Sequence, residues 1–145
     1  MTNTPHDAVE RCLARARALI GVPWRHQGRD PCIGLDCVGL LVLALGVKED
    51  ALPSYSREPH AGVLETALAY YLGPALRADA PWRAGDIAVL AYGGALRHCG
   101  LLADDASGGG FSLIHTDTRL GRVTEHPLDR RWQRRIRLLY RGVAA

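Results

Sequence analysis

Apolar residues recur with a helical period in three segments of the first half of the chain. In the first segment they fall every three or four residues, which is the pattern of one buried helix face. The second segment is apolar on nearly all sides, so we expect it to be fully buried. Asp7 and Asp36 lie near the starts of these two segments as candidate N-caps. The pattern predicts helices at residues 6–20, 37–45 and 63–72.

After Pro81 the pattern changes to short β-like runs that are separated by turns rich in glycine and aspartate. Helices followed by an antiparallel meander predict an α+β fold, with N-terminal helices packed on a C-terminal sheet. The length of 145 residues fits a single domain, 1–145. The predicted strands lie at residues 86–91, 97–103, 111–115, 122–126 and 134–140.

Composition narrows the class of protein. Hydrophobic residues make up 48% and charged residues 23%, close to the globular average, which argues against a disordered chain. The longest apolar stretch, residues 37–47, is shorter than the about 20 residues that cross a bilayer, so no membrane span is expected. Residues 1–10 are polar and lack the apolar part of a secretory signal, which predicts synthesis in the cytoplasm with reduced thiols.

Positive charge is concentrated near the C-terminus. The net charge is +3 at pH 7, and six arginines close to the end of the chain have no acidic residue among them. Such a cluster can bind nucleic acid, an anionic membrane or an anionic cell-wall polymer. Because apolar residues alternate with these arginines, the favoured interpretation is the solvated face of a terminal strand. The six are Arg130, Arg131, Arg134, Arg135, Arg137 and Arg141.

Cys37 occupies a position where a thiol becomes reactive. It is the first residue of a predicted helix and follows the candidate cap Asp36. The free N–H groups and the positive end of the helix dipole stabilise a thiolate there. This effect is worth about 0.3–1 kcal/mol, or about one pKa unit at best, so a strong nucleophile also needs a base.

Two of the six histidines lie in predicted strands that a turn would join into a hairpin. His98 and His115 are then neighbours. One ring nitrogen of His98 would face Cys37 while His115 orients the other, which is the arrangement of nucleophile, base and orienter. Gly100 is expected to leave space beside His98 for substrate or for the helix end. His126 precedes a proline at a strand end and is assigned a surface role.

Three separated motifs occur in order along the chain, at residues 20–28 (IGVPWRHQG), 35–41 (LDCVGLL), and 82–87 (WRAGDI) with 97–101 (RHCGL). Together they resemble the NlpC-type cysteine peptidases, compact papain-like enzymes that cut the peptide stems of bacterial peptidoglycan. The resemblance spans roughly residues 8–140. It implies a papain-like fold in which Cys37 is the nucleophile, His98 the general base and His115 the orienter.

The resemblance also implies a substrate and a setting. The substrate would be a peptidoglycan stem peptide, cut between γ-D-glutamyl and a diamino acid, with no cofactor, no metal ion and no nucleic acid. Compact members of this kind resemble phage-tail or gene-transfer-agent peptidases, which are particle-associated and act in the cell-wall compartment. Trp24, Arg25 and Asp36 are the candidate substrate-binding residues. Further candidates for the lining of a cleft are His26, Asp117 and Arg119.

Three alternatives remain open. Val38 and Trp24 stand where the family usually has Ser and Tyr, so the chain could be an inactive tail-assembly or wall-binding module of the same fold. An acyltransferase or amidase would share the same Cys–His chemistry. The third alternative is a tetrahedral zinc site, in which alternation places Cys99 and His98 on opposite faces of a strand. Its ligands would be Cys32, Cys37, His98 and Cys99.

Overall fold

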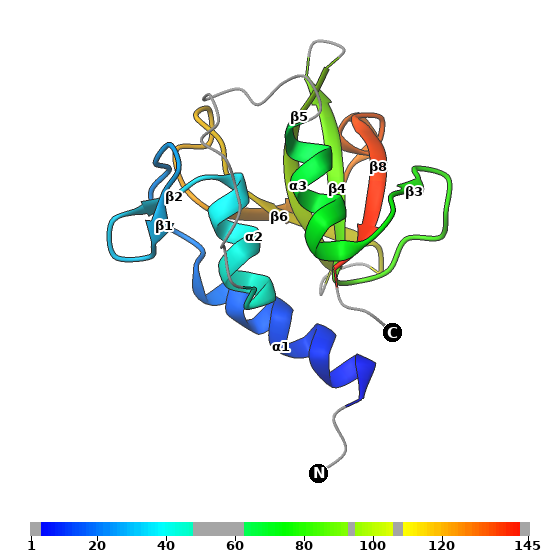
Figure 1. The fold of residues 1–145 in the computed structure, drawn as a ribbon, viewed down its shortest axis with the longest axis horizontal. Helices are drawn as coiled ribbons and strands as arrows, with labels where there is room; N and C mark the ends of the chain where they lie inside the picture. Colours follow the sequence, from blue (N-terminus) through cyan, green and yellow to red (C-terminus); the bar gives the residue numbers. More distant parts are fainter. Residues whose placement is uncertain (1–3, 48–62, 93–94, 106–108, 143–145) are drawn as a thin grey trace.

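The computed structural model describes residues 4–47, 63–92, 95–105 and 109–142. Three helices precede a six-stranded antiparallel sheet, which confirms the predicted α+β class (Figure 1). The helices are α1 (Pro5–Ala18), α2 (Cys37–Leu45) and α3 (Val63–Leu72), and a short fourth helix is α4 (Arg130–Gln133). The sheet contains β3 (Leu76–Arg77), β4 (Asp86–Tyr92), β5 (Ala95–Asp104), β6 (Phe111–His115), β7 (Thr124–Pro127) and β8 (Ile136–Arg141). A separate small pair is β1 (Arg29–Asp30) and β2 (Gly34–Leu35).

The strand order is β3-β8-β4-β5-β6-β7. Strands β4 to β7 form the predicted meander, whereas β8 returns across the sheet to pair with β4 instead of continuing beside β7. The last predicted strand, 134–140, begins too early because residues 134 and 135 form the turn between α4 and β8. The two-residue strands β1, β2 and β3 were not predicted, since such short pairs leave no periodic pattern.

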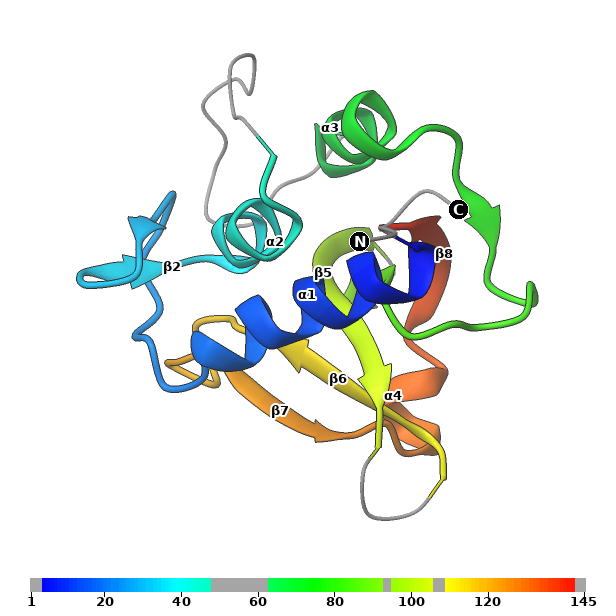
Figure 2. The same cartoon turned by 90° about the horizontal axis from the view of Figure 1, so that it is seen from below.

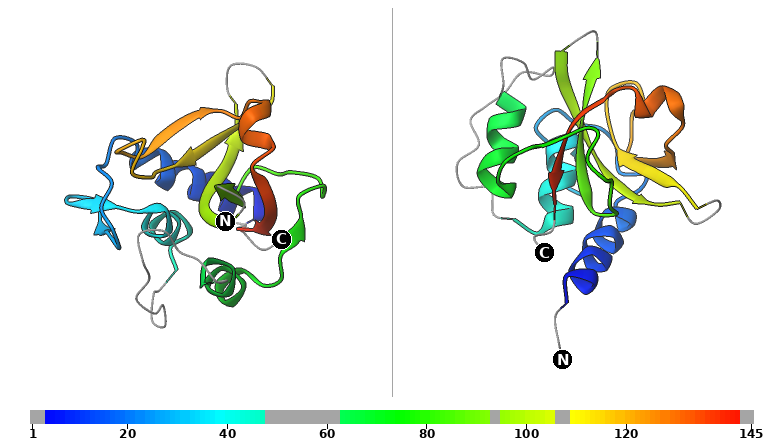
Figure 3. Two further views of the ribbon diagram at one scale, coloured as in Figure 1. Left: turned by 90° about the horizontal axis from the view of Figure 1, so that it is seen from above. Right: turned by 90° about the vertical axis from the view of Figure 1, so that its right-hand side faces the viewer.

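The sheet has a helix face and an opposite face, each with its own apolar core. Cys12 of α1, Leu40 of α2 and Leu101 of β5 belong to the core on the helix face, where the three long helices lie (Figure 2). Leu102 and Leu113 belong to the core on the opposite face, together with Trp132 of α4. Helices α3 and α4 accordingly lie on opposite sides of the sheet (Figure 3). Consecutive residues of β5 therefore contribute to different cores.

The caps of the first two helices differ in how well they were predicted. Helix α1 is capped by Thr4, whose side chain accepts from the backbone N–H of Asp7, so the prediction of Asp7 as the N-cap is wrong. Asp7 is instead the N3 partner of a capping box and accepts from the backbone N–H of Thr4. Helix α2 begins at Cys37 with Asp36 as its N-cap, as predicted.

Candidate active site

The start of α2 is clamped to the loop before it by the carboxylate of Asp36. Its Oδ1 accepts from the N–H of Gly39 at 2.8 Å and from Nη1 of Arg29 at 2.9 Å. Its Oδ2 accepts from the N–H of Gln27 at 2.9 Å. With only 4% of Asp36 exposed, these contacts are the ones expected of a helix cap that also orders a loop. They hold Cys37 at a fixed place relative to that loop.

Close backbone contact reinforces this clamp at Gly39. A Cβ atom on this residue would lie 2.0 Å from the carbonyl oxygen of Gly28, far inside van der Waals contact. The first turn of α2 can therefore lie directly against the loop only because residue 39 has no side chain. The position of Cys37 depends on backbone fit as well as on the Asp36 cap.

The Cys37 thiol contacts two other side chains of the site. It is 9% exposed and hydrogen bonds with the thiol of Cys99 and the imidazole of His98. The Cys99 hydrogen bond, and then the hydrogen bond and charge of His98, lower the pKa of Cys37 to about 5 against the opposing effect of burial. The hydrogen bond to Cys37, together with burial, raises the pKa of Cys99 well above its usual value. These opposite shifts place the Cys99 thiol as a hydrogen-bond donor to the thiolate form of Cys37.

The prediction that Cys99 lies on the face of its strand opposite His98 is confirmed. Its side chain does lie on the helix face of β5, opposite His98, and it is fully buried in the core that contains α2. The start of α2 places Cys37 in that same core, and the Cys37 thiol also contacts His98, so it meets two neighbouring residues of one strand. The sequence signal was the Cys next to His98, which simple alternation assigned away from the site.

Three histidines from three adjacent strands form a row on the opposite face. Nε2 of His98 lies 2.7 Å from Nδ1 of His115, which confirms that these two side chains are neighbours. Nε2 of His115 lies 2.6 Å from Nε2 of His126, and Nδ1 of His126 lies 2.9 Å from the carbonyl oxygen of Pro127. His126 is half-buried in this row, which corrects the surface role assigned to it.

Gly100 allows this row to form, and the expected reason for this glycine was wrong. A Cβ atom on Gly100 would lie 2.7 Å from Cδ1 of Leu113 and 3.1 Å from Cβ of His115. The space beside Gly100 is thus taken by β6 and does not remain for substrate. Its lack of a side chain lets His115 approach β5 closely enough to bond to His98.

Aromatic rings enclose the histidines. Tyr92 stacks on His98 with ring centroids 5.2 Å apart and an interplanar angle of 12°. Trp132 packs against His115 and His126 with centroids 4.9 and 5.0 Å away. Burial, followed by the charges of His98 and His126, lowers the pKa of His115 to about 2, so its ring is neutral across the ordinary pH range.

Cationic and acidic groups then fix Tyr92. Its hydroxyl donates to Oδ2 of Asp117 at 3.1 Å. The guanidinium groups of Arg119 and Arg135 lie 5.6 and 5.0 Å from the centroid of the Tyr92 ring. Asp117 and Arg119 therefore lie near the ring that covers His98. Arg135, from the turn before β8, adds a second positive charge beside that ring.

The remaining predicted substrate-binding residues lie in the loop between α1 and β1. The N–H of Trp24 donates to the carbonyl of Gly121 at 2.9 Å, and the N–H of Arg25 donates to that of Leu35 at 3.0 Å. These bonds lay the loop alongside the segment that leads into Cys37. Trp24 and His26 are half-buried, and Arg25 is exposed. Their contact with substrate stays a prediction.

The six C-terminal arginines separate into two groups. Arg141 pairs with Asp86 across β8 and β4. The other five line an open hollow beside Ala91. Two of them belong to α4 and two to the turn between α4 and β8, so the expected strand face accounts for Arg137 alone among these five. The hollow is lined by Ala91, Arg130, Arg131, Arg134, Arg135 and Arg137.

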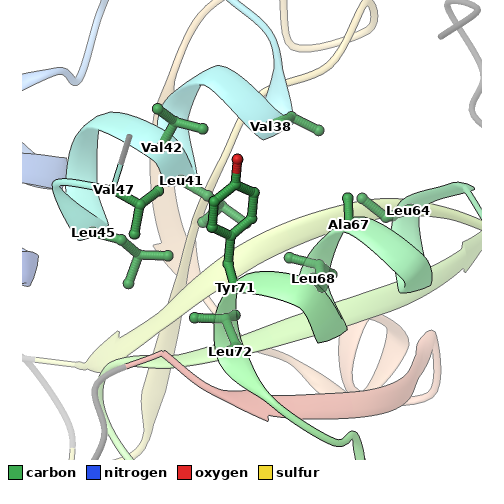
Figure 4. A pocket seen from close by; sticks show the side chains of 10 residues that line it. All are labelled: Val38, Leu41, Val42, Leu45, Val47, Leu64, Ala67, Leu68, Tyr71 and Leu72. Atoms are coloured by element: carbon green, nitrogen blue, oxygen red, sulfur yellow. The ribbon is translucent and has the colours of Figure 1, made fainter. Parts of the chain in front are cut away.

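An apolar cavity of about 30 Å³ lies between α2 and α3, away from the Cys37 thiol. Tyr71 of α3 points its ring toward α2 there, between side chains such as Val42 and Leu41 (Figure 4). Among the residues that the structure describes, the Tyr71 hydroxyl has no hydrogen-bond partner. The lining contains no cysteine, histidine or carboxylate, so it offers no acid–base pair.

The structure does not assemble the zinc alternative. Cys32 is exposed in the loop, whereas Cys37 and Cys99 are buried and all three are free thiols. Within the described ranges, no three His, Cys, Asp or Glu side chains are grouped as ligands for a metal ion. In the same ranges no helix has the length and apolarity needed to cross a membrane.

Comparison with solved structures identifies the fold. No protein-family model and no curated protein matches the sequence. The NlpC/p60 domain of the peptidoglycan hydrolase SagA superposes with a TM-score of 0.60 and 22% identity, over 94% of this chain and 98% of that one. The P60 domain of antigen MAP1204 from M. avium subspecies paratuberculosis gives 0.63 and 20%, over 97% and 98%. The chain therefore has the NlpC/p60 fold, as its motifs suggested.

A third similar structure shows that this fold also occurs without catalysis. RipD from Mycobacterium tuberculosis is described as a non-catalytic NlpC/p60 domain protein adapted to peptidoglycan binding. It matches with a TM-score of 0.59 and 19% identity, over 92% of this chain and 96% of that one. The fold alone does not distinguish a hydrolase from a binding module, so the side chains of the site must decide.

Proposed function

We propose that the chain is a cysteine endopeptidase that hydrolyses peptidoglycan stem peptides at the bond between γ-D-glutamyl and a diamino acid. The observation that carries the proposal is the contact of Cys37, at the N-terminus of α2, with His98, which in turn bonds to His115. The three side chains thus lie in the spatial order of a nucleophile, a base and an orienter. The NlpC/p60 fold and its peptidoglycan hydrolase SagA support the choice of substrate.

The proposed reaction begins when His98 takes the proton of the Cys37 thiol. Because Nε2 of His98 faces His115, its Nδ1 is the nitrogen that serves Cys37. The thiolate attacks the amide carbonyl carbon, and N–H groups at the start of α2, including that of Cys37, stabilise the oxyanion. His98 then protonates the leaving amine, the C–N bond breaks, and a thioester remains. Water hydrolyses the thioester, with His98 as the base.

Digestion of a purified stem peptide tests this proposal. The wild-type chain should split a disaccharide tetrapeptide into a γ-D-glutamyl product and a peptide with a new diamino-acid amino group, measured by mass spectrometry. Cys37→Ala should abolish both products. An amidase or a transferase would give products of other masses, because the bond that is cut or the acceptor would differ.

A non-catalytic wall-binding module is the second candidate, favoured by the similarity to RipD. Co-sedimentation with purified peptidoglycan separates the two functions. If the wild-type chain binds peptidoglycan but does not cleave it, the binding module is the correct function and the endopeptidase is not. Neither cleavage nor binding would contradict both candidates.

The resemblance to phage-tail and gene-transfer-agent peptidases extends the proposal to delivery. The chain would reach the cell wall as part of a particle. Sedimentation of the chain with purified particles would support this extension, and its recovery only as free protein would contradict it.

A further inference from the structure

His126 does not contact Cys37, yet it is joined to it through two other rings. The three histidines come from neighbouring strands, and His126 pairs in register with Leu113, two residues before His115. Such diagonal neighbours on one sheet face are within reach of ring side chains. His126 is also held by Trp132, with ring centroids 5.0 Å apart. Its place at the end of the row is therefore fixed by both strands and packing.

The direction of the hydrogen bonds along the row follows from its last member, His126. The carbonyl oxygen of Pro127 can only accept, so Nδ1 of His126, 2.9 Å away, carries a hydrogen. In the neutral ring Nε2 of His126 is then bare and accepts, which requires a hydrogen on Nε2 of His115. The pKa of His115, lowered to about 2 by burial and its two histidine neighbours, keeps that ring neutral. Its Nδ1 is therefore bare.

The bare Nδ1 of His115 decides the state of His98. It can only accept, so Nε2 of His98, at 2.7 Å, carries a hydrogen. A neutral His98 is then left with an unprotonated Nδ1 for the Cys37 proton. After proton transfer the imidazolium still donates from Nε2 to the same acceptor. The hydrogen bond from His98 to His115 thus has the same direction whether His98 is neutral or protonated.

An orienter that is itself a histidine needs this extra support. A carboxylate can only accept, so it fixes the ring beside it without help. A neutral imidazole has one donor and one acceptor and can present either of them to His98. A buried N–H without an acceptor is destabilising, so an acceptor at the far nitrogen of His115 selects one of its two tautomers.

We propose that His126 is a positioning residue, which uses the Pro127 carbonyl to hold His115 in the tautomer that accepts from His98. The inference rests on the proposed function only in taking His98 as the base for Cys37. His126 itself touches neither the thiol nor, by this account, the substrate.

The test measures tautomers and thiol reactivity together. Long-range ¹H–¹⁵N spectra of ¹⁵N-histidine protein report which ring nitrogen carries hydrogen. Wild-type protein should show hydrogen on Nδ1 of His126 and on Nε2 of His115 and His98. His126→Phe keeps a ring against Trp132 but neither accepts nor donates, so both tautomers of His115 should appear. Alkylation of Cys37 by iodoacetamide at mildly acidic pH should then slow about ten-fold.

His126→Gln is the matched control, because its amide oxygen can still accept from Nε2 of His115. It should keep the wild-type tautomers and alkylate Cys37 within about two-fold of the wild-type rate. An unchanged His115 tautomer and unchanged alkylation in His126→Phe would overturn the inference. So would a wild-type His126 with its hydrogen on Nε2, a result that does not depend on any variant folding.

The failure of this inference differs from that of the proposed function. If wild-type Cys37 alkylates no faster than the exposed thiol of Cys32, the nucleophile of the proposed function is wrong. If Cys37 is activated but His126→Phe changes neither readout, only the role of His126 is wrong.

Discussion

The two sides of the Cys37 thiol are built in different ways. On the helix side, Asp36 bonds to groups three, seven and nine residues away, and backbone atoms of the loop and α2 lie in direct contact. On the histidine side, the ring contacts join residues 17 and 11 positions apart across three strands. The helix side sets where the sulfur lies, whereas the histidine side sets where its proton goes. Changes on the first should lower stability, and changes on the second should lower reactivity.

The largest effect is expected at His98. Its replacement in His98→Gln keeps a side chain that can bond to His115 but cannot take the thiol proton. Stem-peptide hydrolysis should fall by about 10²–10⁴-fold, the usual contribution of a general base. The urea midpoint should change little by comparison. Hydrolysis that stays above a tenth of the wild-type rate, measured by product mass spectrometry, would remove His98 from the mechanism.

The matching change on the helix side is Gly39→Ala. The new Cβ atom would lie 2.0 Å from the carbonyl oxygen of Gly28, so backbone must move. We expect a loss of about 3 kcal/mol in the free energy of unfolding, the upper range for overpacking. Urea denaturation measures it. Gly110→Ala is the control, because a Cβ atom there meets nothing within 4 Å, and equal stability of the two variants would contradict the account.

Cys99→Ala tests a residue that links the two sides. Cys99 lies on the helix face of the sheet but affects the ionisation of the Cys37 thiol. Its hydrogen bond contributes most to the low pKa of Cys37, so the pKa should rise when the donor is removed. Because hydrogen bonds to charged groups are worth about 1.5–3 kcal/mol, Cys37 alkylation at mildly acidic pH should slow by about ten-fold or more. Cys12→Ala, another fully buried thiol, is the control. Equal alkylation rates in the two variants would exclude the Cys99 contribution.

The smallest effect is expected for Asp36→Asn, where the two sides should respond in opposite directions. The amide oxygen still caps α2, but the charge that pairs with Arg29 and the acceptor for the N–H of Gln27 are lost, which should cost about 1 kcal/mol of stability or more. The Asp36 charge raises the pKa of Cys37, so its removal should lower that pKa and increase alkylation by less than about ten-fold. Stability and alkylation measured on one sample test this. A fall in both would contradict the division into two sides.

The same division explains what the sequence could predict. Local patterns correctly predicted α2 from Cys37 to Leu45 and its Asp36 cap, because an N-cap and its helix are adjacent in the chain. The hairpin spacing correctly predicted that His98 and His115 are neighbours. The contact of His126 depends on the register of β7, and the return of β8 to β4 depends on long-range pairing. Neither leaves a local periodic signal, so both were missed.

The site shows the same limit at single residues. Alternation along β5 gave the correct face for Cys99 but could not tell that the start of α2 reaches that face. Gly100 was assigned to substrate space, although it accommodates Leu113 and His115 of the next strand. In each case the missing information was the position of an element far away in the sequence.

The pH dependence of Cys37 alkylation by iodoacetamide tests the central claim most directly. Peptide mass spectrometry reads each cysteine separately, and the exposed Cys32 is an internal reference. Only the thiolate reacts, so the rate follows the ionisation of the thiol. We predict a half-maximal rate at about pH 5 for wild-type Cys37. In His98→Gln the profile should move toward the free-thiol value of about 8.5. A wild-type profile centred near about 8.5, or one that His98→Gln leaves unchanged, would contradict the account.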